Sequence, residues 1–405
     1  MVLEKVAFLY ATFPRSTETF VRRELRALWD SGLQPQAFSL WGGASLWNGI
    51  EVKLFPKHKL FTLFFWLPYW AFTRPKEFGQ TLKFLWDKAC PNLQNFNETF
   101  LGLGFALVEA KNFQKKNYSL VHGVWATMPA TAAFAIHKLV GIPFSMGAHA
   151  YDLFRKGGDW LLPMKLESTS FVRTSSKSSA SRLIQWGVPE NKIKLIRRGL
   201  ETFSTRNSFE LHYPRKLKLI AIGRLVSKKG YFHMLRIALE LSRDQVPYEL
   251  EIIGDGALEK RIQAEILRFG LQENVFLLGA KKEEEVRKFL LLSDAFLFTG
   301  IIDAQGDRDG IPNVIPEAMD AGCLVISSKN AGASEAFIDG VSGFSMNPDT
   351  PMEWVGLLKD FLDNPAEFEK IRKNASKHVR ENFNIKRTAS SLNRSIHKAI
   401  ENVTS

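Results

Sequence analysis

Five short apolar runs in the second half of the chain are separated by amphipathic stretches. The runs are LKLIAIG (217–223), YELEIIG (248–254), NVFLLG (274–279), DAFLFTG (294–300) and CLVISS (323–328). Apolar runs of this length that end at Gly or Ser predict buried strands. Between them we expect helices over Tyr231–Ser242, Leu258–Phe269, Lys282–Leu291 and Val314–Ala321. This alternation predicts a parallel sheet with helices on both faces.

The first half repeats the pattern with longer interruptions. It predicts a strand over 4–11, a helix over Glu18–Ser31 that ends at Gly32, and a helix over Lys177–Trp186. Further strand ends are predicted at LVHGVWA (120–126), PFSMGAHA (143–150), FVRTS (171–175) and NKIKLIRRG (191–199). The pattern therefore predicts an α/β chain with two doubly wound domains, joined near residues 200–215. The stretch 367–403 is helical in pattern and contains no strand.

The stretch LFTLFFWLPYWAFTRPKEFGQTLKFLW (60–86) departs from this scheme, because it is dense in Phe, Trp and Leu and contains few acids. Its uncharged run is shorter than the roughly 20 residues of a membrane-spanning helix, and Pro68 interrupts it. Two interpretations remain open. The stretch is either a helical excursion packed on its own domain or a segment that lies in a membrane interface, where Trp and Tyr beside Lys and Arg are typical.

Length and composition limit the class of protein. The chain has 405 residues, enough for two domains, and its apolar fraction of 45% and charged fraction of 24% are typical of a soluble globular protein. Two cysteines, Cys90 and Cys323, cannot form a disulfide framework or a structural zinc site, and they fit a reducing compartment. The N-terminus lacks the pattern of a signal peptide, so we expect a cytoplasmic protein.

Charge is distributed unequally between the halves. Residues 1–200 contain 26 Lys and Arg against 13 Asp and Glu, whereas residues 201–405 contain 28 against 29. Nine of the ten Trp also lie in the first half. A basic, tryptophan-rich half is suited to nucleic acid or to the anionic inner leaflet of a membrane, although surface charge for solubility explains the excess equally well.

Two segments of the second half carry candidate chemistry. GRLVSKKG (223–230) follows a predicted strand and precedes a helix, so Arg224 and Lys229 lie where cations and backbone N–H groups could hold a diphosphate, or where they are simply solvated charges. In DRDGIPNVIPEAMDAGCLVIS (307–327), Gly310 permits close approach of a ligand and Pro312 is placed in the first turn of a helix. Asp309 and Glu317 are spaced to accept hydrogen bonds from two parts of one ligand.

These motifs resemble the retaining glycosyltransferases of the GT-B fold, family GT4. The resemblance covers nearly the whole chain, from FPRSTETFVRRELRAL (13–28) through FSMGAHAYDLF (144–154) to GRLVSKKG and the Asp309–Glu317 pair. It is greatest with the branch that builds colanic acid, other exopolysaccharides or lipopolysaccharide. The family's fold implies two Rossmann-like domains that face each other across a cleft: an N-terminal acceptor domain over 1–205, a C-terminal donor domain over 206–380, and a helix over 381–405 that returns to the first.

The resemblance also implies roles for single residues. Arg224 and Lys229 match the family's pair that grips the donor diphosphate, and Glu317 matches the acid that holds the nucleotide ribose. Asp309 takes the position of the acid that contacts the donor sugar, where the family usually has Glu. The loop that faces the donor phosphates corresponds to Gly310, Ile311, Pro312, Asn313 and Val314.

In the first half, His149 matches the family's histidine near the reaction centre, while His122 is expected to be structural. The family's usual glycine-rich first loop is replaced by TFPRSTETF, which leaves Glu18 and Thr19 as acceptor candidates. The resemblance implies transfer of a hexose from a UDP- or GDP-linked sugar to a saccharide or lipid-linked acceptor. We expect a peripheral protein at the inner face of the plasma membrane, with an anionic membrane surface as partner and no nucleic acid.

Two cations and a helix N-terminus can stabilise a departing diphosphate without metal. We therefore expect no cofactor and metal-independent transfer with retained configuration. Three other classes of protein fit the sequence less well. A nicotinamide-dependent oxidoreductase needs a third glycine after Gly254-Asp255-Gly256, and a nucleic-acid-binding protein leaves the donor motifs unexplained. A scaffold that has lost catalysis is suggested only by Asp309.

Overall fold

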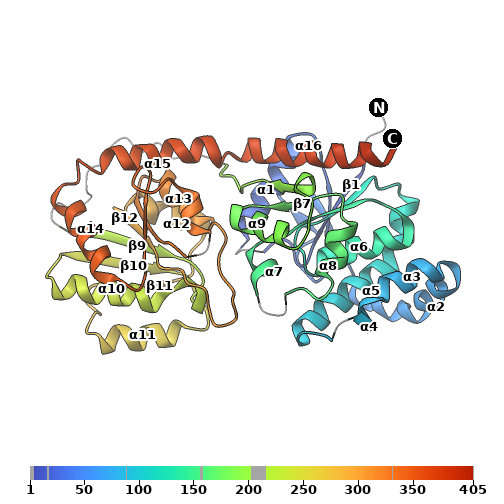
Figure 1. Cartoon of the computed structure of the whole chain (residues 1–405), viewed down its shortest axis with the longest axis horizontal. Helices are drawn as coiled ribbons and strands as arrows, with labels where there is room; N and C mark the ends of the chain where they lie inside the picture. The colour runs from blue at the N-terminus through green and yellow to red at the C-terminus, as the bar shows by residue number, and fades with distance from the viewer. Residues whose placement is uncertain are drawn as a thin grey trace. The chain divides into compact units, whose positions relative to one another are not determined.

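The computed structural model describes residues 4–15, 18–87, 89–155, 158–201, 216–330 and 332–404. The chain divides into two compact units (Figure 1). Unit 1 comprises Met1–Arg197 and Ile385–Ser405, and unit 2 comprises Arg198–Asn384. The domain boundary predicted between residues 205 and 206 lies outside the described residues. Each unit contains one large, mainly parallel sheet.

Unit 1 is built on an eight-stranded sheet in the order β3-β4-β2-β1-β5-β6-β7-β8. All neighbouring strands are parallel except the pair β3–β4. The strands are β1 (Val6–Tyr10), β2 (Gln36–Ser39), β3 (Leu46–Trp47), β4 (Ile50–Leu54), β5 (Leu120–Gly123), β6 (Phe144–Gly147), β7 (Val172–Thr174) and β8 (Ile193–Leu195). The order around β1 reverses between β1 and β5, which defines the topological switch point of this sheet.

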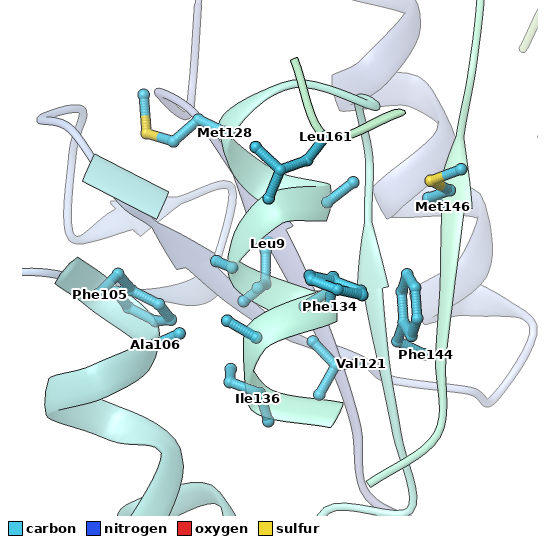
Figure 2. Packing of buried hydrophobic residues seen from close by; sticks show 14 of the residues in the cluster. Leu9, Phe105, Ala106, Val121, Met128, Phe134, Ile136, Phe144, Met146 and Leu161 are labelled. Carbon is cyan, nitrogen blue, oxygen red and sulfur yellow. The ribbon is translucent and has the colours of Figure 1, made fainter. Parts of the chain in front are cut away.

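Helices cover both faces of the unit 1 sheet. They are α1 (Thr19–Asp30), η1 (Lys57–Thr62), α2 (Leu63–Thr73), α3 (Pro75–Leu82), α4 (Phe84–Asp87), α5 (Leu93–Lys115), α6 (Met128–Val140), α7 (Ala150–Phe154), α8 (Leu162–Ser168), α9 (Lys177–Gln185), η2 (Glu190–Lys192) and α16 (Ile385–Thr404). Alternate residues of β1 enter opposite cores: Ala7 and Leu9 pack with α5 and α6, whereas Val6, Phe8 and Tyr10 pack with α1 and α16. Figure 2 shows the first core, where Phe134 lies between Leu9 and Phe144.

Unit 2 contains a six-stranded parallel sheet in the order β11-β10-β9-β12-β13-β14. The strands are β9 (Leu217–Ile222), β10 (Tyr248–Ile253), β11 (Val275–Gly279), β12 (Ala295–Phe298), β13 (Leu324–Ser328) and β14 (Phe344–Met346). Numbered within the unit, this is the order 3-2-1-4-5-6 of a dinucleotide-binding sheet. Its switch point lies between β9 and β12, where Leu219 pairs with Ala295 and Ile220 with Phe296. Ligands of such sheets bind beyond the carboxyl ends of the two strands at that point.

The helices of unit 2 again cover both faces of the sheet (Figure 1). They are η3 (Ser227–Lys229), α10 (Tyr231–Arg243), α11 (Glu259–Arg268), α12 (Glu283–Leu291), α13 (Val314–Asp320), η4 (Ala333–Ala336), α14 (Pro351–Asp363) and α15 (Glu369–Asn382). In β9, Leu217 and Leu219 enter one core with α10 and α14, while Ile220 enters the other with α13 and α15. Because both faces are covered, the strands are mostly apolar, with Lys218 in β9 and Glu249 and Glu251 in β10 as charged exceptions.

The chain returns to unit 1 at its C-terminal helix. The N–H of Leu200 donates to the carbonyl of Phe383 at 2.6 Å, so the two ends of unit 2 lie side by side. Residues 385–404 then form α16, which packs along α1 (Figure 1). Leu392 and Ile396 of α16 are fully buried in the core that Phe8 and Leu25 also enter. The helix thus completes one face of unit 1.

The predicted α/β class is confirmed, and every predicted strand of the second half is present. The sequence does not predict the edge strands β3 and β14, the short inner strands β2 and β4, or the helices α5 and α14. Edge strands are short and half-exposed, so they lack a continuous apolar run. The buried side of α5 contains Asn95, Thr99 and Gly102 beside larger apolar residues, which weakens its helical pattern.

Candidate functional site

The loop after β9 lies against the end of β12. It passes Arg224, forms η3 and enters α10 at Tyr231. Gly230 joins η3 to α10 with a φ of 71°, and a Cβ at this position would lie 1.9 Å from the carbonyl oxygen of Thr299. Only glycine permits that approach. The two loops at the switch point are therefore held in contact by the backbone itself.

Lys229 extends into the space between these loops. Its ammonium lies 5.1 Å from the centre of the Phe298 ring and 2.7 Å from Oδ2 of Asp309. A Cβ on Gly223 would approach the lysine stem to 3.3 Å, so glycine at the end of β9 leaves room for it. The structure thus brings together two residues that the sequence analysis assigned to one ligand.

Lys228 and Asp307 join this pair, and the sequence analysis missed both. The Nζ of Lys228 lies 3.0 Å from Asp307 and 3.5 Å from Oδ1 of Asp309. We refer to Lys228, Lys229, Asp307 and Asp309 as the charge network. Lys-Lys and Asp-Arg-Asp are visible in the sequence, but nothing there pairs segments 79 residues apart. The signal that could have found them is the adjacency of two switch-point loops with opposite charges.

The carboxylates of the charge network are presented by a compact loop between β12 and α13. The side chain of Asp303 accepts hydrogen bonds from the N–H groups of Gln305 and Asp307, each at 2.9 Å. The N–H of Ile301 donates to the carbonyl of Lys228 at 2.9 Å. These bonds fix the start of the loop to η3, so Asp307 and Lys228 meet without a long mobile connection.

Asp309 is ionised by its surroundings. Burial raises the pKa of its carboxyl, but the charges of Lys229 and then Lys228 outweigh burial and hold the pKa below its usual value. Its side chain is 16% exposed, and those of Lys228 and Lys229 are 8% and 12% exposed. Two buried cations and two acids of comparable exposure give a site with no net charge, a condition under which buried ions are tolerated.

The remaining donor-side candidates line the same loops. Arg224 is exposed, and within the described part of the chain its guanidinium makes no ion pair or hydrogen bond. Glu317 lies in the first turn of α13. Gly310, Ile311, Pro312, Asn313 and Val314 form the connection into that helix. Pro312 lies in the turn before α13 rather than in its first helical turn, because its carbonyl accepts the N–H of Ile315 at 3.0 Å and the helix begins at Val314.

His149 follows β6 in unit 1 and begins α7. Its N–H donates to Oδ2 of Asp152 at 2.9 Å, so the aspartate closes the first turn of that helix. Its Nδ1 lies 3.3 Å from the hydroxyl of Ser175, and its ring meets that of Trp125 edge to face at 5.4 Å. The imidazole is only 7% exposed. These contacts fix the ring orientation at the carboxyl end of the sheet.

Beneath His149 lies a second group of buried charges. Lys165 is fully buried, pairs with Asp159, and donates to the carbonyl of Ala126 and to the hydroxyl of Thr131. Burial lowers the pKa of Lys165 despite the acid beside it. Burial also raises the pKa of Asp152 to about 7, against the effect of its hydrogen bond from the N–H of His149. Asp152 is thus a carboxyl without a cation of its own, unlike Asp309.

The other first-half candidates occupy the switch point of the unit 1 sheet. Glu18 precedes α1 and pairs with Arg15 at 3.4 Å, and Thr19 is the first residue of the helix. His122 on β5 is buried and hydrogen-bonded to Ser145 at 2.8 Å. Burial, and then the charge of Arg173, lowers its pKa to about 3, so it is neutral at physiological pH. This agrees with a structural role for His122.

A pocket of about 860 Å³ opens in unit 1 beside α7, α8 and α9. Its lining combines apolar, basic and acidic side chains with one indole; these include Leu153, Arg155, Arg182, Trp186, Asp159 and Glu167. The guanidinium of Arg182 lies 5.0 Å from the Trp186 ring. A cavity with an apolar floor and a few charged groups has the usual character of a small-molecule site.

The helices that contain residues 60–86 both pack on unit 1 and expose large apolar side chains. Within α2, Trp70 is buried and its indole N–H donates to the carbonyl of Leu107 at 2.8 Å. The other side of the same segment is in solvent. We call residues 57–100 the aromatic segment; its exposed large side chains are Phe61, Phe64, Phe65, Leu67, Phe72, Leu85, Trp86, Leu93, Phe96 and Phe100. Phe61, Phe64 and Phe72 are 86%, 92% and 86% exposed.

Such a concentration of exposed aromatic rings is uncommon on a protein that has no apolar partner. Lys57, Arg74, Lys76 and Lys83 lie in the same segment and are exposed. One side of the segment packs on unit 1, as the first interpretation of residues 60–86 predicts, and the other side is exposed. The membrane-interface interpretation stays a prediction. No helix in the described ranges has both the length and the apolar character to cross a bilayer.

Comparison with known sequences identifies the second unit. Residues 204–378 match the family described as glycosyl transferases group 1. The amylovoran biosynthesis glycosyltransferase AmsK of Erwinia amylovora is 34% identical over 165 residues, which are 40% of each chain. The putative colanic acid biosynthesis glycosyltransferase WcaL of Salmonella typhimurium is 26% identical over 94% of this chain and 96% of its own length.

Solved structures match the fold of the whole chain. HepE of Anabaena, in complex with UDP and glucose, aligns with a TM-score of 0.70 and 16% identity over 98% of this chain and 100% of its own. Sucrose-phosphate synthase of Thermosynechococcus elongatus aligns with a TM-score of 0.72 and 15% identity over 98% of both chains. These neighbours have the GT-B architecture of two parallel-sheet domains, which the described units share.

Proposed function

Because the chain is a glycosyltransferase of group 1, we propose that it transfers a hexose from a nucleoside-diphosphate sugar to a saccharide in exopolysaccharide or lipopolysaccharide biosynthesis. The observation that carries the proposal is that Lys229 and Arg224 lie in the loop after β9, at the switch point of the unit 2 sheet. Relatives named for the biosynthesis of amylovoran and colanic acid support the polymer class. The complex of HepE with UDP and glucose supports a nucleotide-sugar donor. UDP- and GDP-linked sugars are both candidates in this proposal.

Breaking a bond between a sugar and a diphosphate places negative charge on the departing oxygens. Arg224 is exposed and Lys229 is preorganised by Phe298 and Asp309, so both can face that charge. We propose that this pair replaces a metal ion and that the acceptor attacks on the face from which the diphosphate leaves, which retains the anomeric configuration. Glu317 would hold the ribose and Asp309 the sugar ring, while the backbone from Gly310 to Val314 faces the phosphates.

The acceptor belongs, in this proposal, to unit 1. His149 is held by Asp152 and Ser175 at a strand end, the place expected for a group near the reaction centre. The pocket with Arg155, Arg182 and Trp186 offers stacking and anion-binding groups to a saccharide or its lipid-linked phosphate. Glu18 and Thr19, at the switch point of the same sheet, are further candidates for acceptor contact.

We also propose that the aromatic segment attaches the protein to the cytoplasmic face of the plasma membrane. Phe61, Phe64 and Phe72 are exposed beside Lys57 and Arg74, and such a composition inserts rings among lipid headgroups while the cations face anionic lipid. A lipid-linked acceptor would then be presented to unit 1 at the same surface.

A thermal-shift panel with UDP, GDP, ADP and their common sugar conjugates, with and without EDTA, tests the donor site first. A ligand that binds only the folded protein raises its Tm by mass action. We expect a rise with one nucleotide family that EDTA does not change. No rise with any nucleotide would leave the donor site without support and favour a scaffold that has lost catalysis. A rise abolished by EDTA would contradict metal independence.

A further inference from the structure

The charge network gives Lys229 two competing anionic partners. In the structure its Nζ lies 2.7 Å from Oδ2 of Asp309. On the proposed function, the same ammonium must bind the donor diphosphate. A carboxylate that stays in contact with Lys229 would repel the arriving phosphates and neutralise the cation they need. The donor therefore has to displace Asp309 from Lys229, at least in part.

Lys228 provides an alternative partner for the displaced carboxylate. Its Nζ is 3.5 Å from Oδ1 of Asp309, on the other oxygen of the same group. Lys228 itself cannot turn to the donor easily, because it is held at 3.0 Å by Asp307 and its carbonyl accepts the N–H of Ile301. Its side chain is also the least exposed in the network, at 8%.

The geometry therefore gives the two adjacent lysines different roles. Lys229 is less buried and has one carboxylate partner, whereas Lys228 is held between two. The ionised state of Asp309 depends on both cations, so the carboxylate still has a counter-ion when Lys229 is engaged elsewhere. If Lys228 were absent, Asp309 would lose its only cationic partner when the diphosphate binds Lys229. The unpaired carboxylate would then oppose donor binding.

We propose that Asp309 is the internal counter-ion of Lys229 in the donor-free protein, and that Lys228 is the positioning residue that retains Asp309 when a diphosphate takes Lys229. The inference rests on the proposed donor site and deepens it. Lys228 contacts no donor atom in this scheme. It acts by making Lys229 available, and it keeps Asp309 placed toward the sugar.

Binding of UDP, with GDP measured in parallel, tests the exchange by titration calorimetry at fixed ionic strength. We expect Asp309→Asn to bind the nucleotide about three- to tenfold more tightly than the wild type, although sugar transfer falls. Lys228→Met should bind it about three- to tenfold more weakly, because Asp309 then has only Lys229 as partner. Lys228→Arg should restore binding, and a single cooperative thermal transition in each variant would show that it is folded.

The double variant Lys228→Met/Asp309→Asn separates exchange from simple addition of charges. If Asp309 transmits the effect of Lys228, the loss caused by Lys228→Met disappears once Asp309 is neutral. The matched control is Lys228→Met in an Asp307→Asn background, where the loss should persist, since Asp307 does not contact Lys229.

Two results would overturn the inference. If Lys228→Met weakens binding equally with Asp309 and with Asn at that position, the lysine acts only through general electrostatics and the exchange is wrong. The exchange is also wrong if the Asp309→Asn variant binds UDP no more tightly than the wild type does. A wild-type protein that binds neither UDP nor GDP would instead remove the donor site, and the proposed function would fail together with the inference.

Discussion

The charge network of unit 2 and the aromatic segment of unit 1 are opposite in how side-chain polarity matches exposure to water. In the network, groups that prefer water are withdrawn from it, and Lys228 and Lys229 each face a carboxylate of the same chain. In the aromatic segment, groups that avoid water are exposed to it, and Phe64 is 92% exposed. The charges of the network are paired within the chain. In the aromatic segment, by contrast, many large apolar side chains are left exposed.

The difference indicates which interactions each region can use to bind a partner. A network whose charges are already balanced can bind an anion only by exchanging partners, so its affinity is moderate and adjustable. A helix that is apolar all round has buried one side, through Trp70, and gains more only from an apolar phase. The first region suits a substrate that must leave after each turnover, and the second suits a lasting attachment.

The largest expected effect removes the central cation of the network. Lys229→Ala should reduce the rate of sugar transfer by about 100- to 1,000-fold, because charge on the departing diphosphate loses a preorganised partner. The matched control is Lys216→Ala, which removes an exposed lysine that pairs with Glu249 in the same unit. Initial rates and Tm measured for both decide the matter. Near-normal transfer by Lys229→Ala would contradict the assignment of the diphosphate site.

The next effect removes rings from the aromatic segment. Phe64→Ser/Phe72→Ser should weaken binding to anionic vesicles at low salt by about 10- to 100-fold, since each phenyl group that enters lipid contributes about 1.5–3 kcal/mol at full burial. The free energy of unfolding of this double variant in solution should not fall. Phe276→Ser, at a ring 37% exposed in unit 2, is the control and should leave vesicle binding unchanged. A wild-type protein that ignores anionic vesicles would contradict the proposed attachment.

A smaller effect tests how closely the network is built. Gly230→Ala should lower the free energy of unfolding of unit 2 by about 2 kcal/mol, because a Cβ would meet the carbonyl of Thr299 and φ is positive. Gly356→Ala is the control: it lies in α14, with open space around its Cβ, and should stabilise by about 0.5–1 kcal/mol. Denaturant unfolding of both variants measures the difference, and equal midpoints would disagree with the observed approach.

The last prediction concerns the pH dependence of stability. It compares Asp152, which has no cation paired with it among the described residues, with Asp309, which lies between Lys228 and Lys229. The pKa of Asp152 is raised to about 7, so the folded state keeps its proton at pH values where the unfolded chain, with a pKa near 3.8, has released it. Stability contributed by this group is lost as pH rises through that window. The stability of Asp152→Asn should therefore be similar to that of the wild type at pH 4 and higher than it at pH 8.

Thermal unfolding across that range measures the effect. Asp309→Asn should show the opposite trend, since the pKa of Asp309 lies below its usual value and its contribution is lost only as pH falls through that lowered value. A stability difference between Asp152→Asn and the wild type that does not grow between pH 4 and pH 8 would contradict the raised pKa.

The sequence predicted much of unit 2 and less of unit 1. Strands of unit 2 are buried on both faces and are rich in Leu, Ile, Val and Phe, so β9 to β13 are visible without a structure. In unit 1, the two-residue β3 and the half-exposed β4 have no such signature. Helix α5 was missed because its 23 residues are interrupted by Gly102 and Gly104, which lie where α6 and η1 approach closely.

The site shows the same limit. Arg224, Lys229 and Glu317 stand in recognisable local motifs, and Asp309 could be placed near them from the strand–loop–helix pattern. Lys228 and Asp307 could not, because their meaning depends on a contact between loops that follow non-consecutive strands. The exposure of Phe64 and Phe72 was equally hidden, since the pattern of α2 is apolar on every side and does not show which side the protein covers.

The return of the chain to unit 1 has a consequence for synthesis. Unit 2 ends at Asn384, where its first and last segments already meet, so it can complete its core as soon as that residue has emerged. Unit 1 began earlier but must wait longer, because Leu392 and Ile396 of α16 fill its core. The part of the protein made first is thus the part finished last, and a chain interrupted between 384 and 404 would carry a finished second unit on a first unit whose α1 side is still open.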